Sequence, residues 1–269
     1  MADKINKSLI SQKLGIARST LYYKSKKDEQ DEKDKKLILE VMDSNASYGH
    51  KRIAIALNMN KKKVLRLMKK FNLKPRIMRG KKPGKKGDLK LATAIYENEI
   101  KNICPIIPNF AWAGDFTYIK YQGAFIYLAT VIDIYTREII GASLGKWHNR
   151  HLIKSALMEA IRNRQAIPNY FHSDQGSEYQ SEEYASYLED HGIKISMSKK
   201  SSPWENGYQE SFYSNFKLEL GPVSRFATDG HLAEAIYHQI YYYNNRRIHT
   251  ELKMPPTKFY ELARQRLNM

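Results

Sequence analysis

The sequence predicts a chain of two parts, a basic all-α region followed by an α/β core that contains a mixed sheet. Short helical patterns fill residues 1–73, whereas strand patterns rich in aromatic and β-branched residues begin near residue 112. Three such patterns follow one another, and strand and helix patterns then alternate as far as residue 197. Positive charge is concentrated between the two parts, because residues 51–90 contain 16 Lys and Arg against one Asp.

Composition limits the class of protein. A length of 269 residues with 42% hydrophobic and 12% aromatic residues allows one or two domains with a real core. No apolar run reaches the roughly 18 residues of a membrane span, and the first residues lack a secretory signal, so we expect a cytoplasmic protein. The net charge of +17 favours nucleic-acid phosphate as the partner. The single cysteine, Cys104, excludes an internal disulfide and a multi-cysteine zinc site, and we expect it to be buried.

The first predicted segment, residues 1–36, combines a small helical hairpin with a charged stretch. Ser8 to Tyr23 has the pattern of two short helices joined at Gly15, which is a helix-turn-helix arrangement. DNA contact and a plain helical hairpin both remain open for it. The expected inward residues are Leu9, Leu14, Ile16 and Leu21. Residues 24–36 are either a solvated linker or a helix extension.

A helical DNA-binding domain is predicted for residues 37–73. Its helices are expected at Leu37 to Met42, Lys51 to Leu57, and Lys61 to Phe71, the last with Asn60 as its N-cap. The third helix has an apolar stripe for the core and a basic face that we expect to contact phosphates. The candidate DNA-binding residues here are Lys51, Arg52, Lys61, Lys62, Lys63, Arg66, Lys69 and Lys70. Residues 74–100 are a basic linker, and a short helix is expected within residues 91–107.

The core is predicted to occupy residues 101–269. Its first three strands are separated by short turns and therefore form an antiparallel meander. These strands are Trp112 to Tyr121, Phe125 to Ile134 and Glu138 to Leu144. The alternating part contains a helix at Leu152 to Arg162, a strand at Asn169 to Phe171, a helix at Glu182 to His191 and a strand at Ile193 to Met197. A further helix, His231 to Tyr243, belongs to a C-terminal helical tail.

Three carboxylates stand out within this core. Asp115 lies in the first strand, Asp174 follows the short strand at 169–171, and Glu210 lies inside a later helix. For that helix we expect Ser202 as N-cap and Glu205 as the acid of a capping box. A solvated helix face would also explain Glu210, so the spacing alone leaves both interpretations open.

Ordered motifs across the chain resemble the transposases of bacterial insertion sequences, more closely the second-reading-frame product whose core is similar to retroviral integrase. They are Tyr48-Gly49-His50-Lys51-Arg52-Ile53, Trp112-x-x-Asp115-x-Thr117-Tyr118-Ile119, Tyr127-Leu128-x-x-Val131-x-Asp133, His172-Ser173-Asp174-x-Gly176-x-x-Tyr179, Glu210-Ser211-Phe212-Tyr213 with Lys217 and Glu219, and Tyr243-Asn244-x-x-Arg247-x-His249. The resemblance implies an RNase H-like fold and an Asp, Asp, Glu triad, here Asp115, Asp174 and Glu210. One departure is Glu205-Asn206-Gly207, where the family usually has Asp-Asn-Ala.

The resemblance also implies a function. The expected enzyme cleaves and joins DNA strands at the ends of an insertion sequence by phosphoryl transfer, with the triad binding two Mg²⁺ ions, which Mn²⁺ can replace. Its partners would be double-stranded DNA, at least one further copy of the chain on DNA, and an upstream-frame protein, separate or fused; its place would be the bacterial nucleoid. Further DNA-contact candidates are Lys217, Asn206, Trp204, Tyr213, Arg246, Arg247 and His249, the last three otherwise forming an exposed basic turn. A catalytically inactive DNA-binding regulator and a nuclease without strand transfer are the alternatives.

Overall fold

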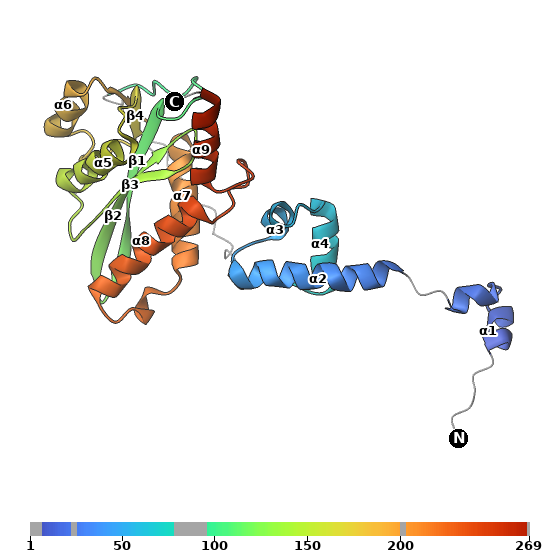
Figure 1. The fold of residues 1–269 in the computed structure, drawn as a ribbon. Helices are drawn as coiled ribbons and strands as arrows, with labels where there is room; N and C mark the ends of the chain where they lie inside the picture. The colour runs from blue at the N-terminus through green and yellow to red at the C-terminus, as the bar shows by residue number, and fades with distance from the viewer. Residues whose placement is uncertain (1–6, 23–25, 78–95, 200–202, 268–269) are drawn as a thin grey trace. The chain divides into compact units, whose positions relative to one another are not determined.

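The structure is a computed structural model that describes residues 7–22, 26–77, 96–199 and 203–267. The chain divides into two compact units, Met1–Pro75 and Arg76–Met269, drawn in Figure 1. Within the described ranges, none of the helices is long and apolar enough to cross a membrane.

The first unit begins with a helical hairpin. Helix α1 (Lys7–Lys13) is followed by a turn in which Gly15 has a φ of +64°, and then by the 3₁₀ helix η1 (Arg18–Tyr22). The two predicted short helices are therefore present. Our expectation that Leu14 and Ile16 point inward is wrong, since 62% and 39% of these residues are exposed. A hairpin this short offers little surface under which they could be buried.

Three further helices form the core of the first unit. They are α2 (Lys26–Ser44), α3 (His50–Ala56) and α4 (Lys61–Lys70), and Asn60 caps α4 as predicted, its side chain accepting a hydrogen bond from the Lys62 N–H. The boundary that we expected between residues 36 and 37 falls inside α2, so residues 26–36 are a helix extension. Asp31 and Asp34 lie on the same face of α2 as buried Ile38, which explains why this charged stretch packs.

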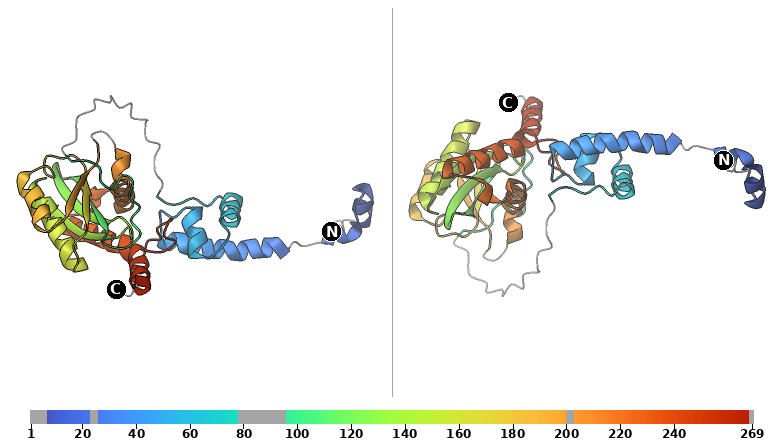
Figure 2. Two further views of the ribbon diagram at one scale, coloured as in Figure 1. Left: turned by 90° about the horizontal axis from the view of Figure 1, so that it is seen from above. Right: turned by 90° about the horizontal axis from the view of Figure 1, so that it is seen from below.

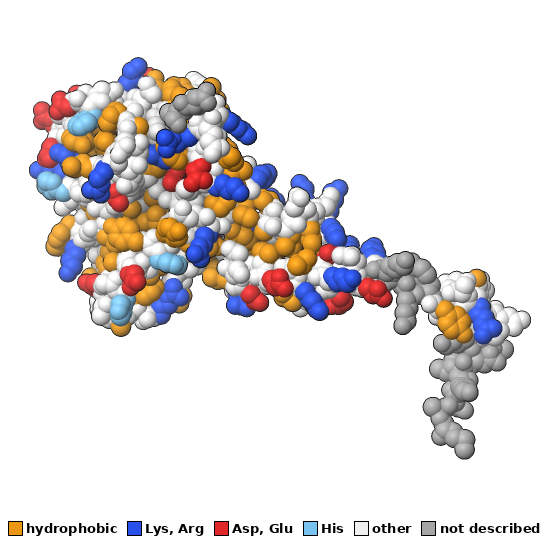
Figure 3. All heavy atoms as spheres, viewed as in Figure 1, with side chains coloured by type: hydrophobic (Ala, Val, Ile, Leu, Met, Phe, Trp, Pro, Cys, Tyr) orange, Lys and Arg blue, Asp and Glu red, His pale blue; other side chains and the backbone are white. Residues whose placement is uncertain are grey.

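Ion pairs join α2 to the basic helix α4. Asp31 accepts hydrogen bonds from Arg66 (2.6 and 2.8 Å) and Lys70 (2.9 Å), and Lys63 lies 2.6 Å from Asp34. Hydrogen bonds from Arg66 and Lys70 hold the pKa of the Asp31 carboxyl well below its usual range. Figure 3 shows acidic and basic side chains interleaved over this part of the surface. Half of the basic face of α4 is therefore engaged within the unit.

The second unit contains a five-stranded mixed sheet in the order β3-β2-β1-β4-β5. The strands are β1 (Ala111–Tyr121), β2 (Ala124–Asp133), β3 (Ile139–Gly145), β4 (Tyr170–Ser173) and β5 (Lys194–Met197). The first three pair antiparallel, whereas β1 with β4 and β4 with β5 pair parallel. The predicted meander and the predicted alternation are both confirmed, and they form one RNase H-like sheet.

Helices cover both faces of the sheet, as the views in Figures 1 and 2 agree. Helices α5 (Arg150–Arg164) and α6 (Glu182–Asp190) contribute to one apolar core, and α7 (Gly207–Leu220) and α8 (Asp229–Asn245) contribute to the other. The short η3 (Val223–Arg225) joins α7 to α8, and α9 (Pro256–Leu267) packs against α8. Gly114 of β1 leaves room for the Phe171 ring of β4, which a Cβ at that position would meet.

One expectation near the start of this unit is wrong, because Cys104 is exposed. Of the range in which a short helix was expected, residues 96–107 contain turns and no helix, and residues 91–95 lie outside the described residues. Ile100 of this segment belongs to the apolar core to which α7 and α8 contribute, Tyr96 packs against the other core, and Cys104 lies outside both.

Candidate active site

Two of the three acids lie at the same level of neighbouring strands. Strands β1 and β4 are parallel neighbours in which Ala113 lies opposite His172. Asp115 and Asp174 each follow two residues later. Because parallel neighbours run in the same direction, Asp115, inside β1, comes to the level of Asp174, just beyond the C-terminal end of β4. The pairing register thus gives the convergence that the sequence could only suggest.

The turn after β4 holds Asp174 in place. Its Oδ1 accepts a hydrogen bond of 3.0 Å from the Gly176 N–H. A Cβ at position 176 would lie 3.1 Å from this Oδ1 and 3.2 Å from Oε2 of Glu178, so this close approach favours glycine. Glu178 in turn lies 2.6 Å from Nδ1 of His148. The site therefore has a fourth carboxylate, already paired with a histidine, beside Asp174.

Helix α7 carries Glu210 and is tied to the sheet on either side of it. The fully buried Gln209 donates from Nε2 to the carbonyls of Ala113 (2.6 Å) and Thr130 (3.1 Å). One turn later, the Tyr213 hydroxyl donates to the carbonyl of Asp115 at 2.7 Å. These bonds fix α7 against β1 and β2 at the level of Asp115, while the Glu210 side chain remains exposed.

Electrostatics connect Asp115 with both other acids. Burial raises the pKa of Asp115 to about 7, and the negative charge of Asp174 and then that of Glu210 contribute further. The Phe116 N–H, which donates to Asp115, and the charge of Lys217 oppose this shift. Burial also raises the pKa of Asp174, where the Gly176 N–H opposes it and the charge of Glu178 adds to it. Negative charge is thus crowded beside the C-terminal end of β4.

Such a donor set suits a hard divalent cation. Carboxylate oxygens are its preferred ligands, and a positive ion would offset the repulsion that raises the pKa of Asp115. Among the residues that the structure describes, no three His, Cys, Asp or Glu side chains are gathered closely enough to hold an ion together. The acids therefore influence one another across the site without forming a complete coordination shell.

The start of the Glu210 helix differs from our expectation. Residues Pro203–Asn206 form a separate 3₁₀ turn, η2, and α7 begins at Gly207. The expected N-cap, Ser202, lies outside the described residues. The predicted capping box joins Glu205 to Ser202 and therefore also lies partly outside the described residues; within them, Oε2 of Glu205 accepts from the Lys199 N–H (2.8 Å) and from the Asn98 amide (3.0 Å). Its role is still structural, because it joins two segments of chain far apart in sequence.

Several predicted DNA contacts are at the surface. Lys217 is exposed, with Nζ 4.9 Å above the Tyr118 ring. Arg246 is exposed, His249 is half-buried in a bridge to Met254, and the side chain of Trp204 lies outside the description. Of the contacts predicted in the first unit, Lys51, Lys61, Lys62, Lys69 and the ion-paired Lys70 are exposed, whereas Arg52, Lys63 and Arg66 are half-buried.

Three other predicted contacts point into the protein. Tyr213 is 7% exposed and hydrogen-bonded to the sheet, and Asn206 is 5% exposed. Arg247 is 1% exposed and donates from Nε to both oxygens of Glu219, at 2.8 and 3.0 Å. Tyr213 and Arg247 thus bond within the unit and Asn206 is buried, so the structure does not place these side chains at the surface; their contact with DNA stays a prediction.

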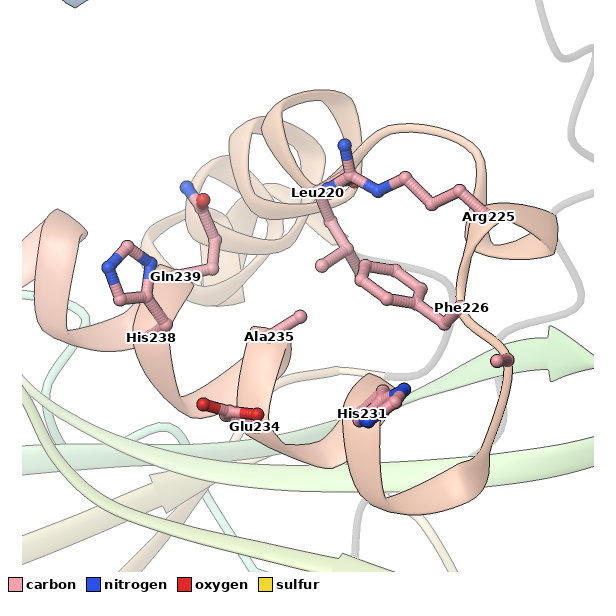
Figure 4. A pocket seen from close by; sticks show the side chains of 9 residues that line it. Leu220, Arg225, Phe226, His231, Glu234, Ala235, His238 and Gln239 are labelled. Atoms are coloured by element: carbon pink, nitrogen blue, oxygen red, sulfur yellow. Dashed lines mark hydrogen bonds between the residues drawn. The ribbon is translucent and has the colours of Figure 1, made fainter.

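An open hollow of about 460 Å³ lies elsewhere on the unit, between the end of α7, η3 and α8 (Figure 4). Arg225 reaches across it and donates to the Leu220 carbonyl at 2.9 Å. Other residues around it are Phe226, His231, Glu234, His238 and Gln239. None of the three acids lines this hollow, so it is separate from the candidate site.

Sequence reasoning missed Gln209, Glu178 and His148. Gln209 precedes Glu210 and stands four residues before Tyr213, so a helical-face analysis that used Phe212 and Phe216 as core positions would have found it. Glu178 and His148 come from different loops. No local pattern in the sequence connects them.

Comparisons with known proteins indicate the family of the chain. The integrase core domain family matches residues 106–203, and a second integrase core domain family matches residues 191–256. InsK of Escherichia coli (strain K12), named as a transposase for insertion sequence element IS150, is 32% identical, with 88% of this chain and 87% of that protein covered. A 31 kDa protein of insertion element IS600 from Shigella sonnei is 29% identical over 94% of this chain and 98% of its own length.

Among solved structures, the HTLV-2 integrase catalytic core domain aligns with a TM-score of 0.47 and 20% identity, covering 58% of this chain and 98% of that chain. The identity to the IS150 protein and its coverage are the findings that decide the family. The chain belongs to the bacterial insertion-sequence transposases with an integrase-type, RNase H-like catalytic core, which are enzymes of DNA transposition.

Proposed function

We propose that Asp115, Asp174 and Glu210 are the catalytic carboxylates of this transposase. The observation that carries the proposal is the position of Asp115 relative to the other two acids: Asp115 and Asp174 lie at the same level of neighbouring strands, and the charges of Asp174 and Glu210 both raise the pKa of Asp115. Titratable groups perturbed in this way by burial and like charge are typical of active sites. Cutting and joining of DNA strands would take place there.

The integrase core domain family depends on a divalent cation. For this chain we propose Mg²⁺, replaceable by Mn²⁺, as two ions held by Asp115, Asp174 and Glu210. Bound there, the ions would activate the attacking oxygen and stabilise the leaving oxygen of an in-line displacement. Closure of the side chains around the ions would complete the coordination that the described geometry leaves open.

The surrounding residues have distinct tasks in this proposal. Gln209 and Tyr213 keep the backbone of Asp115 fixed relative to α7, so that the carboxylates stay in register during reaction. Lys217, whose charge reaches Asp115, is suited to a phosphate next to the reacting bond. Carboxylates alone would repel the DNA backbone, and this cation offsets the repulsion.

DNA binding by the first unit would use the part of its basic surface that is not engaged internally. We propose Lys51, Lys61, Lys62 and Lys69 for phosphate contact. At least two copies of the chain would act together on DNA, because two element ends are joined in one reaction, and an upstream-frame protein would be a further partner. Sedimentation of a joined-end complex with one protomer per pair of ends would contradict this assembly. The reaction would take place in the cytoplasm, at the nucleoid.

The sharpest test compares two neighbouring glutamates. Glu210→Gln removes a carboxylate charge on an exposed side chain, so cleavage and joining should fall to background while DNA binding and thermal stability persist. Glu205→Gln keeps a side-chain oxygen that can accept from Lys199 and Asn98, so activity should persist. Both variants are assayed for strand cleavage and for strand transfer of an end with a free 3′ hydroxyl.

The same assay distinguishes the remaining candidates. A nuclease would cleave without joining, and an inactive regulator would do neither in the wild-type protein. If Glu205→Gln is inactive and Glu210→Gln is active, the triad assignment is wrong.

A further inference from the structure

An aromatic strip, defined here as Phe116, Tyr118, Phe125, Tyr127 and His148, runs along the projecting end of the β1–β2 hairpin. Its ring centroids form an unbroken series: Tyr118 to Phe125 at 5.4 Å, Phe125 to Tyr127 at 6.4 Å and Tyr127 to His148 at 4.9 Å. Phe116 stacks on His148 at 5.8 Å and 9°. Strand β4 is too short to pair with this end of β1, whose pairing with it stops at Ala113.

The outer half of the strip is unusually open for aromatic residues. Tyr118 is 59% exposed and Phe125 is 45% exposed, and 51% of the His148 side chain is exposed. Cross-strand aromatic pairs stabilise hairpins, and that role accounts for the contact between the rings. Hairpin stabilisation does not explain why the ring faces next to the proposed catalytic centre are exposed to solvent.

The strip is linked at both ends to the proposed catalytic residues. At one end Nζ of Lys217 lies 4.9 Å above the Tyr118 ring. Lys217 follows Glu210 in α7 by seven residues, about two helical turns. At the other end His148 contacts Glu178, whose charge acts on Asp174. Phe116 directly follows Asp115 in β1, so the two side chains lie on opposite faces of the sheet. The strip therefore approaches the carboxylates at its two ends, through Lys217 and Glu178.

We propose that the aromatic strip binds unpaired bases of the DNA strand that leads to the reacting phosphate. The inference rests on the proposed function. Exposed rings stack on any base, and stacking requires bases whose faces are not already covered by a duplex. Exposed Lys120 on the same strand face and Lys217 at the end supply positive charge, while the nearby acid Glu178 is paired with His148. This charge favours a nucleic-acid strand over a second copy of a chain whose net charge is +17.

The test uses the full chain and the variant Tyr118→Ala/Phe125→Ala. Its affinity is measured for a DNA end with an unpaired, forked terminus and for the same end fully paired. We expect binding of the forked end to weaken by at least about fivefold, the lower range for loss of one stacked base, with little change for the paired end. The matched control is Tyr237→Ala/Tyr241→Ala on α8, which removes two tyrosines of 45% and 55% exposure and should change neither affinity.

Several outcomes would overturn the proposal. Equal affinities of wild type and variant for the forked end, or an equal loss for both ends, would exclude stacking of unpaired bases. Loss of self-association without DNA, measured by sedimentation, would show that the strip is an interface between copies. If the double variant does not fold, ultraviolet crosslinking of the wild-type protein to 5-iodouracil in the forked strand tests the proposal. Crosslinks to residues of the strip would support it, and crosslinks only elsewhere would overturn it. Neither substituted residue has a carboxylate. If the proposal about the aromatic strip is refuted, the Glu210→Gln result and the proposed function are therefore not affected.

Discussion

Replacement of Asp115 by Asn should stabilise the catalytic unit when divalent cation is removed, and the gain should grow with pH. Burial, with the charges of Asp174 and Glu210, raises the pKa of Asp115 from 3.8 to about 7. Since the folded-state pKa lies above the unfolded one, the native state binds the proton more tightly. The stability from this proton is fully present below pH 3.8 and is lost as pH rises through about 7. Asn has no charge to bury and avoids that loss.

The magnitude follows from the same shift. From 3.8 to about 7, at about 1.4 kcal/mol per pH unit, the ceiling is about 4 kcal/mol. Asp115 keeps partial solvent contact and titrates together with acidic neighbours, so we expect the stabilisation by Asn to be about 2 kcal/mol larger at pH 8 than at pH 5.

Urea unfolding in a chelator, followed by tryptophan fluorescence, measures this effect. All three tryptophans, Trp112, Trp147 and Trp204, belong to the catalytic unit, so the signal reports that unit alone. Asp190→Asn, at the exposed end of α6, controls for the change in net charge. Saturating Mg²⁺ should reverse the order and favour wild type, because ligand binding stabilises the native state. An identical difference between wild type and Asp115→Asn at both pH values would refute the reasoning.

Two further predictions concern residues whose roles the structure revised. Replacing the exposed lysines of α4 (Lys61, Lys62 and Lys69) by Gln should flatten the salt dependence of DNA binding by about 2–3 in the log–log slope. Replacing the ion-paired set (Lys63, Arg66 and Lys70) should instead mainly lower the thermal midpoint of helix loss, measured by circular dichroism. Equal effects of the two sets would contradict this division. Tyr213→Phe should lower the free energy of unfolding by about 1–3 kcal/mol and reduce turnover without changing DNA affinity, because buried groups around Thr130 and Asp115 lose their hydrogen-bond partner. Weakened DNA binding at unchanged stability would show instead that Tyr213 contacts DNA.

Most of the sheet could be predicted from the sequence because its strands are separated by recognisable turns. The positive φ values of Gln122 and Gly123 mark the turn between β1 and β2. Alternating burial in the second half of β1 and continuous burial in the second half of β2 follow from aromatic and β-branched patterns that the sequence displays. The three acids were found through ordered motifs, and their spacing alone would have left Glu210 on a solvated helix face.

Contacts between distant elements could not be predicted in this way. Arg66 and Lys70 look like DNA-binding residues until Asp31 is known to face them, and Arg247 looks like part of a basic turn until Glu219 is found beside it. In each case a charged residue is buried, and burial of charge requires a partner. The partner is 28 or more residues away along the chain. The acidic residues on the apolar face of α2 were the one feature of the sequence that could have indicated these ion pairs.

The position of Glu210 between two anchors constrains how the site can close around a cation. Gln209 precedes it by one residue and Tyr213 follows it by three, and both are hydrogen-bonded into β1 and β2. Sliding or tilting α7 would break these buried bonds, each at a cost of about 1–3 kcal/mol for an unsatisfied group. Rotation of the exposed Glu210 side chain breaks none of them. The acids can therefore approach one another by side-chain rotation on a fixed frame, which keeps Asp115 and the backbone of α7 in place while Glu210 moves toward the ion.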